Sequence, residues 1–443
     1  MKPASYSPVM NIVLLLGLAL LIGGGAAAQS PTITLTSIPV MGTNDELTGK
    51  VTNVTPASYR VAVYIFVQGW YNKPTDAAPL TVVQNDGTWI CDITTGGADA
   101  YATKIAAFLF PQSYTPPLVD GALTLPTELS THAVASVITD RPSANAFHWC
   151  GYDWDVKNSG GFQFGPGPNY FSDSAQNVWV DTNGKLHLRI THRNGQWQCA
   201  EVFVRRAFGY GTYRFFVDSV VDALDPNVVL GLFTYDDDPT STNGHREIDV
   251  EVSRWSNASD PTNAQFVVQP YNISGNLMRW TIPSGASPTT HSFTWSAGRI
   301  DYVAHNGTFA PPPASVPQIS SWSNTSSSVP LPGDERAHLN LWLFNGAAPG
   351  NGQEVEVVLS RFAFIPAPPA APTVQSAVLD HSGVFHLQLN GDPQVWYRLE
   401  SSGNLINWSP LSSVVAGEAA FEFDDAVGTA TRKFYRVSVV AGQ

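Results

Sequence analysis

The run Arg246-Glu247-Ile248-Asp249-Val250-Glu251-Val252-Ser253 decides the fold that we expect for this chain. Acidic and aliphatic residues alternate along it, and successive side chains of a β-strand point to opposite faces. Glu247, Asp249 and Glu251 would therefore share one face, with the aliphatic residues turned into a core. Acidic residues are depleted in strands and like charges repel, so this pattern favours carboxyl groups that do chemistry. An acidic edge strand facing solvent and half of a calcium site are the alternatives.

Such a row of carboxyl groups suits glycoside hydrolysis, in which one carboxylate is the nucleophile and one carboxylic acid donates a proton. On a flat strand Glu247 and Glu251 would lie roughly 13 Å apart, because each residue rises about 3.3 Å. A retaining pair needs carboxyl groups about 5 Å apart. The two side chains can converge only on the concave side of a curved sheet. The motif thus predicts a bent antiparallel sheet with the acids lining a groove.

Composition narrows the class of protein and of partner. The chain of 443 residues has 36 Gly, 33 Pro, 11% aromatic and only 13% charged residues, which is typical of an exported β-rich protein with many turns. Its formal charge of −13 argues against binding nucleic acid or an anionic membrane surface. A neutral polymer such as a polysaccharide is the expected partner.

The N-terminus has the pattern of a secretory signal peptide. Residues 11–22 are apolar, and small residues over 23–28 end in Ala-Ala-Ala before Gln29. We expect residues 1–28 to be removed; an uncleaved N-terminal anchor is the alternative. The mature protein is expected to be a monomer secreted by bacterial-type export, extracellular or at the cell surface, and not held in the membrane after signal cleavage.

Further series of short strands flank the acidic run. Residues 30–141 predict an N-terminal β-sandwich accessory module, in which Trp70-Tyr71 is either a sugar platform or part of the core. Residues 142–366 form a longer strand series that ends at a Pro-rich linker. Residues 367–443 predict a small C-terminal β-sandwich module.

Five segments of the middle domain, together with Glu247–Glu251, carry a family resemblance. In chain order they are Cys199-Ala200-Glu201, Phe208-Gly209-Tyr210-Gly211-Thr212-Tyr213, Phe233-Thr234-Tyr235, His291–Trp295 with Arg299–Tyr302, and Asn340-Leu341-Trp342. In these segments the middle domain resembles the family-16 glycoside hydrolases, the group of lichenases, laminarinases and xyloglucan transglycosylases. The resemblance covers about half the chain. It implies an all-β chain in which a concanavalin-like jelly roll is flanked by the two smaller β-sandwich modules.

The resemblance also implies roles for individual residues. Glu247 would be the nucleophile, Glu251 the general acid and later the base, and Asp249 the residue that orients the nucleophile, with retention of anomeric configuration. Four residues match family positions that line the sugar-binding groove, although each could instead have a structural role: Glu201, Tyr235, Asn340 and Trp342.

Alternation adds candidates that do not depend on the family. His245 and Trp255 continue the face of the three acids, so that the polar strip ends in an aromatic ring. On the expected neighbouring strand, residues 264–271, Gln265 and Gln269 share one face. Sugars need polar partners and an aromatic surface, although the glutamines could also lie on a solvated strand face.

The chain departs from the lichenase pattern at two positions. His245 stands where that pattern usually has Trp, and Phe203 where it often has Arg. In addition, the acidic loop at residues 236–239 is either a structural calcium site or a solvated turn. We expect no cofactor and no catalytic metal.

Three cysteines are too few for a disulfide framework. Cys150 and Cys199 could pair in an oxidising compartment and leave Cys91 free. Three buried, reduced thiols are the alternative.

Together these features predict a glycoside hydrolase: a secreted, retaining endo-β-glycanase that hydrolyses internal β-1,3- or mixed β-1,3-1,4-glucosidic bonds by double displacement. The alternatives are a catalytically silent, lectin-like polysaccharide-binding protein and a transglycosylase of the same family.

Overall fold

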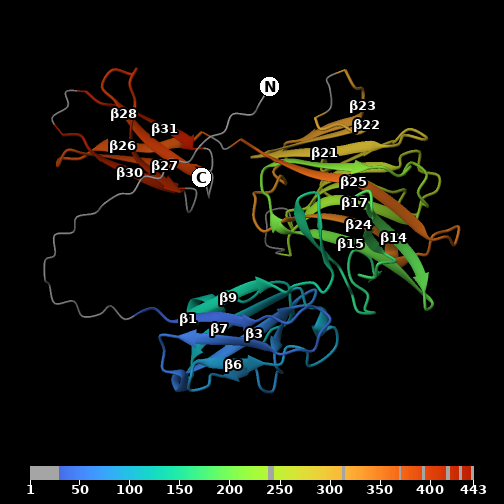
Figure 1. Cartoon of the computed structure of the whole chain (residues 1–443), viewed down its shortest axis with the longest axis horizontal. Coiled ribbons are helices and arrows are strands. Elements are labelled where there is room, and N and C mark those ends of the chain that lie inside the picture. Colours follow the sequence, from blue (N-terminus) through green and yellow to red (C-terminus); the bar gives the residue numbers. More distant parts are fainter. Residues whose placement is uncertain are drawn as a thin grey trace. The chain divides into compact units, whose positions relative to one another are not determined.

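Figure 1 shows the computed structural model of the chain. It describes residues 29–237, 244–311, 315–368, 371–391, 395–415, 420–428 and 432–440. The predicted signal peptide lies outside these residues, as do Asp238 and Pro239 of the acidic loop. The chain divides into two compact units, residues 1–142 and 143–443.

The first unit is a β-sandwich. One sheet has the order β1 (Thr32–Ser37), β2 (Leu47–Thr52), β6 (Thr88–Cys91). The other has the order β8 (Asp120–Ala122), β4 (Trp70–Lys73), β3 (Tyr59–Phe66), β7 (Lys104–Pro111), β9 (Ala135–Asp140), with β5 (Leu80–Val82) also paired to β3. Short helices occur at η1 (Pro56–Ser58), η2 (Asp99–Tyr101) and α1 (Thr127–His132).

Buried side chains from both sheets form one core in this unit, among them Leu47, Val63 and Trp89. Trp70 also belongs to a core, since its ring packs against Phe66 at 5.4 Å and it is only 8% exposed. The structure therefore favours the interpretation of Trp70 as a core residue over its interpretation as a sugar platform.

The second unit contains a sheet that folds into two layers (Figure 1). We call the first the acid layer; its order is β20 (Leu277–Trp280), β19 (Ala264–Val268), β18 (Ile248–Val252), β17 (Val228–Tyr235), β24 (Arg336–Leu343), β15 (Gln196–Ala207), β11 (Tyr152–Val156), β10 (Ala146–Trp149). We call the second the back layer; its order is β13 (Val178–Val180), β14 (Leu186–Arg193), β25 (Val355–Pro366), β16 (Gly211–Val217), β21 (Thr289–Ser296), β22 (Arg299–Asn306), β23 (Gln318–Asn324). β14 also pairs with β15, and β12 (Tyr170–Phe171) and η3 (Phe344–Gly346) complete the domain.

The core lies between the two layers. Ile248, Val250 and Val252 are at most 1% exposed, which confirms the alternation predicted for this strand. Phe266 of β19 stacks on Tyr302 of β22 at 4.9 Å, and the Tyr302 hydroxyl donates to the Val267 carbonyl oxygen at 2.6 Å. Because the aliphatic face of β18 points to the back layer, its carboxyl groups point to the opposite side, which we call the acid face.

The C-terminal residues form two further sheets with a shared core. Their orders are β26 (Thr373–Leu379), β27 (Val384–Asn390), β30 (Ala420–Ala426) and β29 (Ser409–Val415), β28 (Trp396–Ser402), β31 (Phe434–Val440). Leu389, Tyr397 and Phe423 from three of these strands are buried together. The predicted fold class is confirmed: the chain is all-β, with a jelly roll and smaller β-sandwich sheets. In the described part of the chain, no helix is long and apolar enough to cross a membrane.

Candidate active site

The three predicted acids lie on one face at the middle of the acid layer. Asp249 and Glu251 are in β18, and Glu247 comes directly before it, where its carbonyl oxygen accepts from the Gln269 backbone at 3.2 Å. The backbone turns sharply just before this point, because His245 and Arg246 have φ values of 62° and 48°. Asp249 is 2% exposed, and the two glutamates are partly buried.

Antiparallel register aligns further polar residues with Glu251. Residues directly opposite one another across paired strands point to the same face. The row through Glu251 runs across five strands and consists of Gln265, Glu251, Gly231, Asn340 and Glu201. The structure thus brings three predicted sugar-binding residues (Gln265, Asn340 and Glu201) and one predicted catalytic acid (Glu251) into one line.

Gly231 keeps the centre of this row open. A Cβ atom at Gly231 would lie 2.4 Å from Oδ1 of Asn340, closer than any real contact allows. A larger residue would therefore displace the Asn340 amide from the position it takes between Glu201 and Glu251.

Burial raises the pKa values of all three acids, and repulsion by neighbouring carboxylates adds to the shift at Glu247 and Asp249. Burial, followed by the charge of Glu251, raises the pKa of Glu247 to about 8, although a hydrogen bond with Asp249 opposes the shift. Burial also raises the pKa of Glu251 to about 7, against the Gln265 hydrogen bond and the charge of Arg279. The pKa of Asp249 is raised by burial and then by both glutamates. A protonated Asp249 donates to Glu247 and so favours the ionised form of Glu247.

Gln265 and Gln269, predicted to share one strand face as sugar-binding candidates, each donate a hydrogen bond to one of the acids. Gln265 Nε2 donates to Glu251 Oε2 at 2.6 Å, and Gln269 Nε2 donates to Asp249 Oδ2 at 3.1 Å. Arg279 Nη1 in turn donates to Gln265 Oε1 at 3.3 Å. Gln265 is 6% exposed, so the alternative of a solvated strand face is wrong for it.

Glu201 has a different environment from the three acids. Lys157 Nζ lies 3.1 Å from Glu201 Oε2, and His338 Nδ1 donates to Glu201 Oε1 at 3.1 Å. Asn340 Nδ2 adds a longer bond to Oε2 at 3.4 Å. Burial alone would raise the pKa of Glu201, but the Lys157 charge and the His338 bond outweigh it and lower the pKa to about 2. Glu201 is therefore a fixed negative charge.

Aromatic residues lie on both sides of the acids. Tyr235 stacks on His245 at 4.7 Å, and His245 Nδ1 donates to the Asp236 carbonyl oxygen at 2.7 Å. Trp255 packs edge-to-face against Trp342 at 6.1 Å. All four predicted aromatic or His candidates thus belong to ring pairs.

Three polar atoms of the acid face are buried without a hydrogen-bond partner in the described part of the chain. They are Asn340 Oδ1, His338 Nε2 and Trp255 Nε1. Since His338 donates through Nδ1 and burial lowers its pKa, Nε2 is an acceptor. Two acceptors and one donor are therefore left unsatisfied here, which is costly unless a ligand pairs with them.

Sequence reasoning missed three residues of this site: Lys157, His338 and Arg279. His338 could have been found, because it lies two residues before Asn340 on the same strand and so shares its face. Lys157 follows β11, which pairs with β15 far along the chain, and Arg279 is on β20, so no local pattern indicated either residue.

The two departures from the lichenase pattern have visible consequences. Phe203 stacks on His338 at 5.2 Å, and the Arg336 guanidinium lies over the Phe203 ring at 4.8 Å. A cation from the neighbouring strand β24 thus lies beside the position where the family often has Arg. Of the acidic loop, Asp236 pairs with Arg246 and Asp237 with Arg336, so both described acids have cationic partners.

The predicted disulfide between Cys150 and Cys199 is wrong. All three cysteines are described and free. The Cys150 sulfur accepts from the Phe362 backbone at 3.4 Å, whereas the Cys199 thiol donates to Asn169 Oδ1 at 3.4 Å. Each sulfur is engaged with a different strand or loop, which keeps the two residues apart.

No family model matches the chain, and no curated protein matches it. Among solved structures it is similar to a β-glucanase of Bacillus licheniformis, with 19% identity, 51% of this chain and 99% of that chain covered, and a TM-score of 0.37. It is also similar to a β-1,3-1,4-glucanase (lichenase) derived from a mouse hindgut metagenome, with 21% identity, coverage of 48% and 93%, and a TM-score of 0.34. A third similar structure is a pseudo β-1,3-glucanase of Mycobacterium tuberculosis, with 19% identity, coverage of 48% and 91%, and a TM-score of 0.36. Each of these three similarities covers about half of this chain.

Proposed function

We propose that this chain is a secreted, retaining endo-β-glycanase that cleaves internal β-1,3- or mixed β-1,3-1,4-glucosidic bonds. The observation that carries this proposal is the set of three neighbouring carboxyl groups with raised pKa values, those of Glu247, Asp249 and Glu251. Three buried polar atoms without a hydrogen-bond partner lie on the same face. A carboxyl group that keeps its proton near neutral pH can act as a general acid. Sugar hydroxyl groups both donate and accept, so they could satisfy Asn340, His338 and Trp255 together.

In the proposed mechanism, the Glu247 carboxylate attacks the anomeric carbon while Glu251 gives its proton to the departing glycosidic oxygen. This step forms a covalent glycosyl ester on Glu247. Glu251, now ionised, takes a proton from a water molecule, whose oxygen attacks the anomeric carbon and releases Glu247. Two inversions give net retention.

Asp249 and Gln265 would position the two reacting groups. Asp249 donates a hydrogen bond to Glu247, which stabilises the carboxylate that must attack. Gln265 holds Glu251 from the neighbouring strand. Burial raises the pKa values of both glutamates, so that each can hold a proton near neutral pH. Because the charge of Glu251 raises the pKa of Glu247, the protonation states of the two glutamates are coupled.

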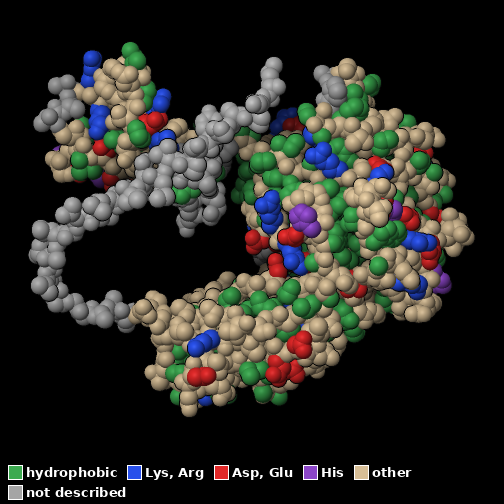
Figure 2. Space-filling model, viewed as in Figure 1, with side chains coloured by type: hydrophobic (Ala, Val, Ile, Leu, Met, Phe, Trp, Pro, Cys, Tyr) green, Lys and Arg blue, Asp and Glu red, His purple; other side chains and the backbone are tan. Residues whose placement is uncertain are grey.

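The surface charge favours a neutral substrate. On the face of the molecule drawn in Figure 2, acidic and basic side chains are interspersed among uncharged ones rather than gathered into one large patch. A neutral glucan does not require a basic groove, whereas a long polyanion would be repelled by a chain of charge −13.

The test is reducing-end release by the mature protein from laminarin, barley β-glucan, xyloglucan, agarose and carrageenan. We expect activity on laminarin or barley β-glucan, and the first product observed by NMR should be the β-anomer. Binding without turnover on every polymer would instead support the lectin-like alternative. Product longer than the substrate, formed in the presence of acceptor oligosaccharides, would support the transglycosylase.

A further inference from the structure

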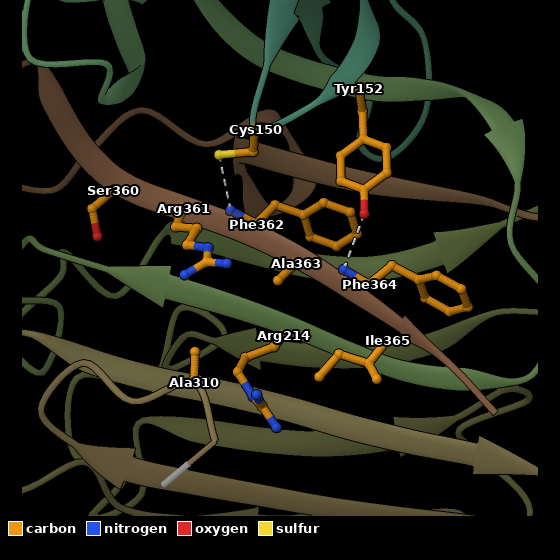
Figure 3. A pocket seen from close by; sticks show the side chains of 10 residues that line it. All are labelled: Cys150, Tyr152, Arg214, Ala310, Ser360, Arg361, Phe362, Ala363, Phe364 and Ile365. Carbon is orange, nitrogen blue, oxygen red and sulfur yellow. Dashed lines mark hydrogen bonds between the residues drawn. The ribbon is translucent and has the colours of Figure 1, made fainter. Parts of the chain in front are cut away.

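A cavity of about 550 Å³ lies in the same domain, beside the strand β25 (Figure 3). β14 pairs with β25 only as far as Leu359, whereas β16 remains paired with β25 up to Pro366. The edge of β25 that β14 leaves free is covered by two side chains. Cys150 accepts from the Phe362 backbone and Tyr152 accepts from the Phe364 backbone, each at 3.4 Å.

Arg214 of β16 lines this cavity and is buried without compensation. It is only 8% exposed, yet its Nε and Nη1 atoms have no hydrogen-bond partner, and no acidic side chain pairs with it in the described ranges. Arg141 of the first unit, which is also buried (2% exposed), shows what a structural arginine needs. Its guanidinium donates to five backbone carbonyl oxygens, those of Pro39, Val40, Thr43, Asp99 and Ala100.

A second cation and a hydroxyl group lie beside Arg214. Arg214 is opposite Ala363 and Arg361 is opposite Phe216, which places both arginines on the same face of the β16–β25 pair. The register shifts between Phe216 and Val217, so Ser360 is a bulge residue outside the ladder. Its hydroxyl group is also buried without a partner. Bulges often re-aim a side chain at a functional site.

This arrangement is unfavourable in the absence of a ligand. A buried cation without a partner loses its hydration, and a second arginine adds repulsion. Burial first, and then Arg361, lowers the pKa of Arg214. Guanidinium groups bind carboxylate, sulfate and phosphate oxygens through charge-assisted hydrogen bonds, and a single such group could satisfy Arg214, Arg361 and Ser360.

We propose that this cavity binds an oxyanion group carried by a saccharide, such as a uronate or a sulfated sugar. Its volume is within the range of small-molecule pockets and leaves room for a sugar ring beside the anion. Ala363, Ile365 and Tyr152 supply an apolar side against which that ring can pack. Its two arginines and Ser360 are on the back layer, and the cavity uses none of the acid-face residues, so it is independent of the proposed hydrolysis.

Calorimetric titration of the mature protein tests this site. The probes are sodium glucuronate, glucose sulfate, inorganic sulfate and, as a neutral control, glucose. We expect glucuronate or glucose sulfate to bind, and Arg214→Met to weaken that binding by about tenfold or more, since charge-assisted hydrogen bonds are lost. Arg299→Met is the matched control, because Arg299 is on the same layer but exposed and paired with Asp301. The affinity of this variant for glucuronate and glucose sulfate should equal that of the wild type.

The outcomes separate the possible sources of the oxyanion. Sulfate that binds as tightly as the acidic sugars, and is weakened by Arg214→Met, would assign the site to the free ion while keeping the oxyanion chemistry. Equal binding of glucose and glucuronate, no binding of any anion, or unchanged affinity in both Arg214→Met and Arg361→Met would overturn the proposal. Arg214→Met removes an uncompensated buried charge, so we expect it to fold. Arg361→Met, which removes the more exposed of the two arginines, should weaken binding of the same anions. Neither change should affect glucan hydrolysis.

Discussion

Glu201 and Glu251 lie in the same row of the acid face, yet their carboxyl groups are held in opposite states. Lys157 and His338 outweigh the burial of Glu201 and lower its pKa to about 2. Glu251 has an amide partner, Gln265, and in the described part of the chain it forms no ion pair with a cation, so burial raises its pKa to about 7. The comparison teaches that a close cation, rather than depth alone, decides whether a buried carboxyl group is a fixed charge or a group that exchanges protons.

The largest effect should come from removing the proposed nucleophile. Glu247→Gln should lower glucan hydrolysis by roughly four orders of magnitude, because the amide cannot form the glycosyl ester. Initial rates of reducing-end release measure the loss. Glu356→Gln, a partly exposed glutamate of the back layer paired with His187, is the matched control and should keep full activity. A Glu247→Gln protein with more than a trace of activity would contradict the assignment.

Glu251→Gln should have the next largest effect, and it should depend on the leaving group. We expect about a hundredfold or greater loss on natural glucan, where the departing oxygen needs a proton. An aryl glycoside with a good leaving group should form the intermediate at nearly the normal rate. Comparing the two substrates in pre-steady-state assays measures this difference, and equal losses on both would argue against the acid role.

Removing Lys157, the cation that pairs with Glu201, should lower the stability of the folded protein. Lys157→Met leaves the Glu201 carboxylate buried without its cationic partner, which should raise the pKa of Glu201. The free energy of unfolding should fall by about 2 kcal/mol. This is less than for a fully buried pair, because Lys157 is partly exposed. Urea unfolding at neutral pH measures it. The double variant Lys157→Met/Glu201→Gln has no buried charge to compensate, so it should recover most of the loss. Equal stability of the single and double variants would show that Glu201 is not held as a charge.

The last expected effect is the pH dependence of stability at Glu247. Its pKa of about 8 in the folded protein exceeds the ordinary value near 4.3. The folded state therefore binds this proton more tightly than the unfolded state, so its contribution to stability is full below the ordinary pKa and is lost as pH rises through 8. Glu247→Gln cannot ionise. Its melting temperature should exceed that of the wild type by a few degrees at pH 8 and by less at pH 5, whereas a constant difference would contradict the raised pKa.

The strand of the acids was predictable because its information is local. Alternation alone placed Glu247, Asp249 and Glu251 on one face, and the same rule placed Gln265 and Gln269 beside them. The Lys157–Glu201 pair joins the end of β11 to β15, which are far apart in the sequence. The register between these two strands brings the side chains together, and local sequence patterns do not encode register. The Cys150–Cys199 prediction failed for the same reason, since cysteine count gave no information on which strand each thiol faces. The buried Arg214 was also invisible, because burial of an arginine depends on the strands around it.

The most direct test of the account is to identify the residue that becomes covalently attached to the sugar. The mature protein would be treated with an activated fluorosugar β-glucoside, which slows release of the glycosyl group, then digested and mapped by tandem mass spectrometry. The account predicts a single modified peptide with the sugar ester on Glu247, and no label when Glu247→Gln is treated in the same way. A label on Glu251, or hydrolysis that proceeds with inversion and without any label, would contradict it.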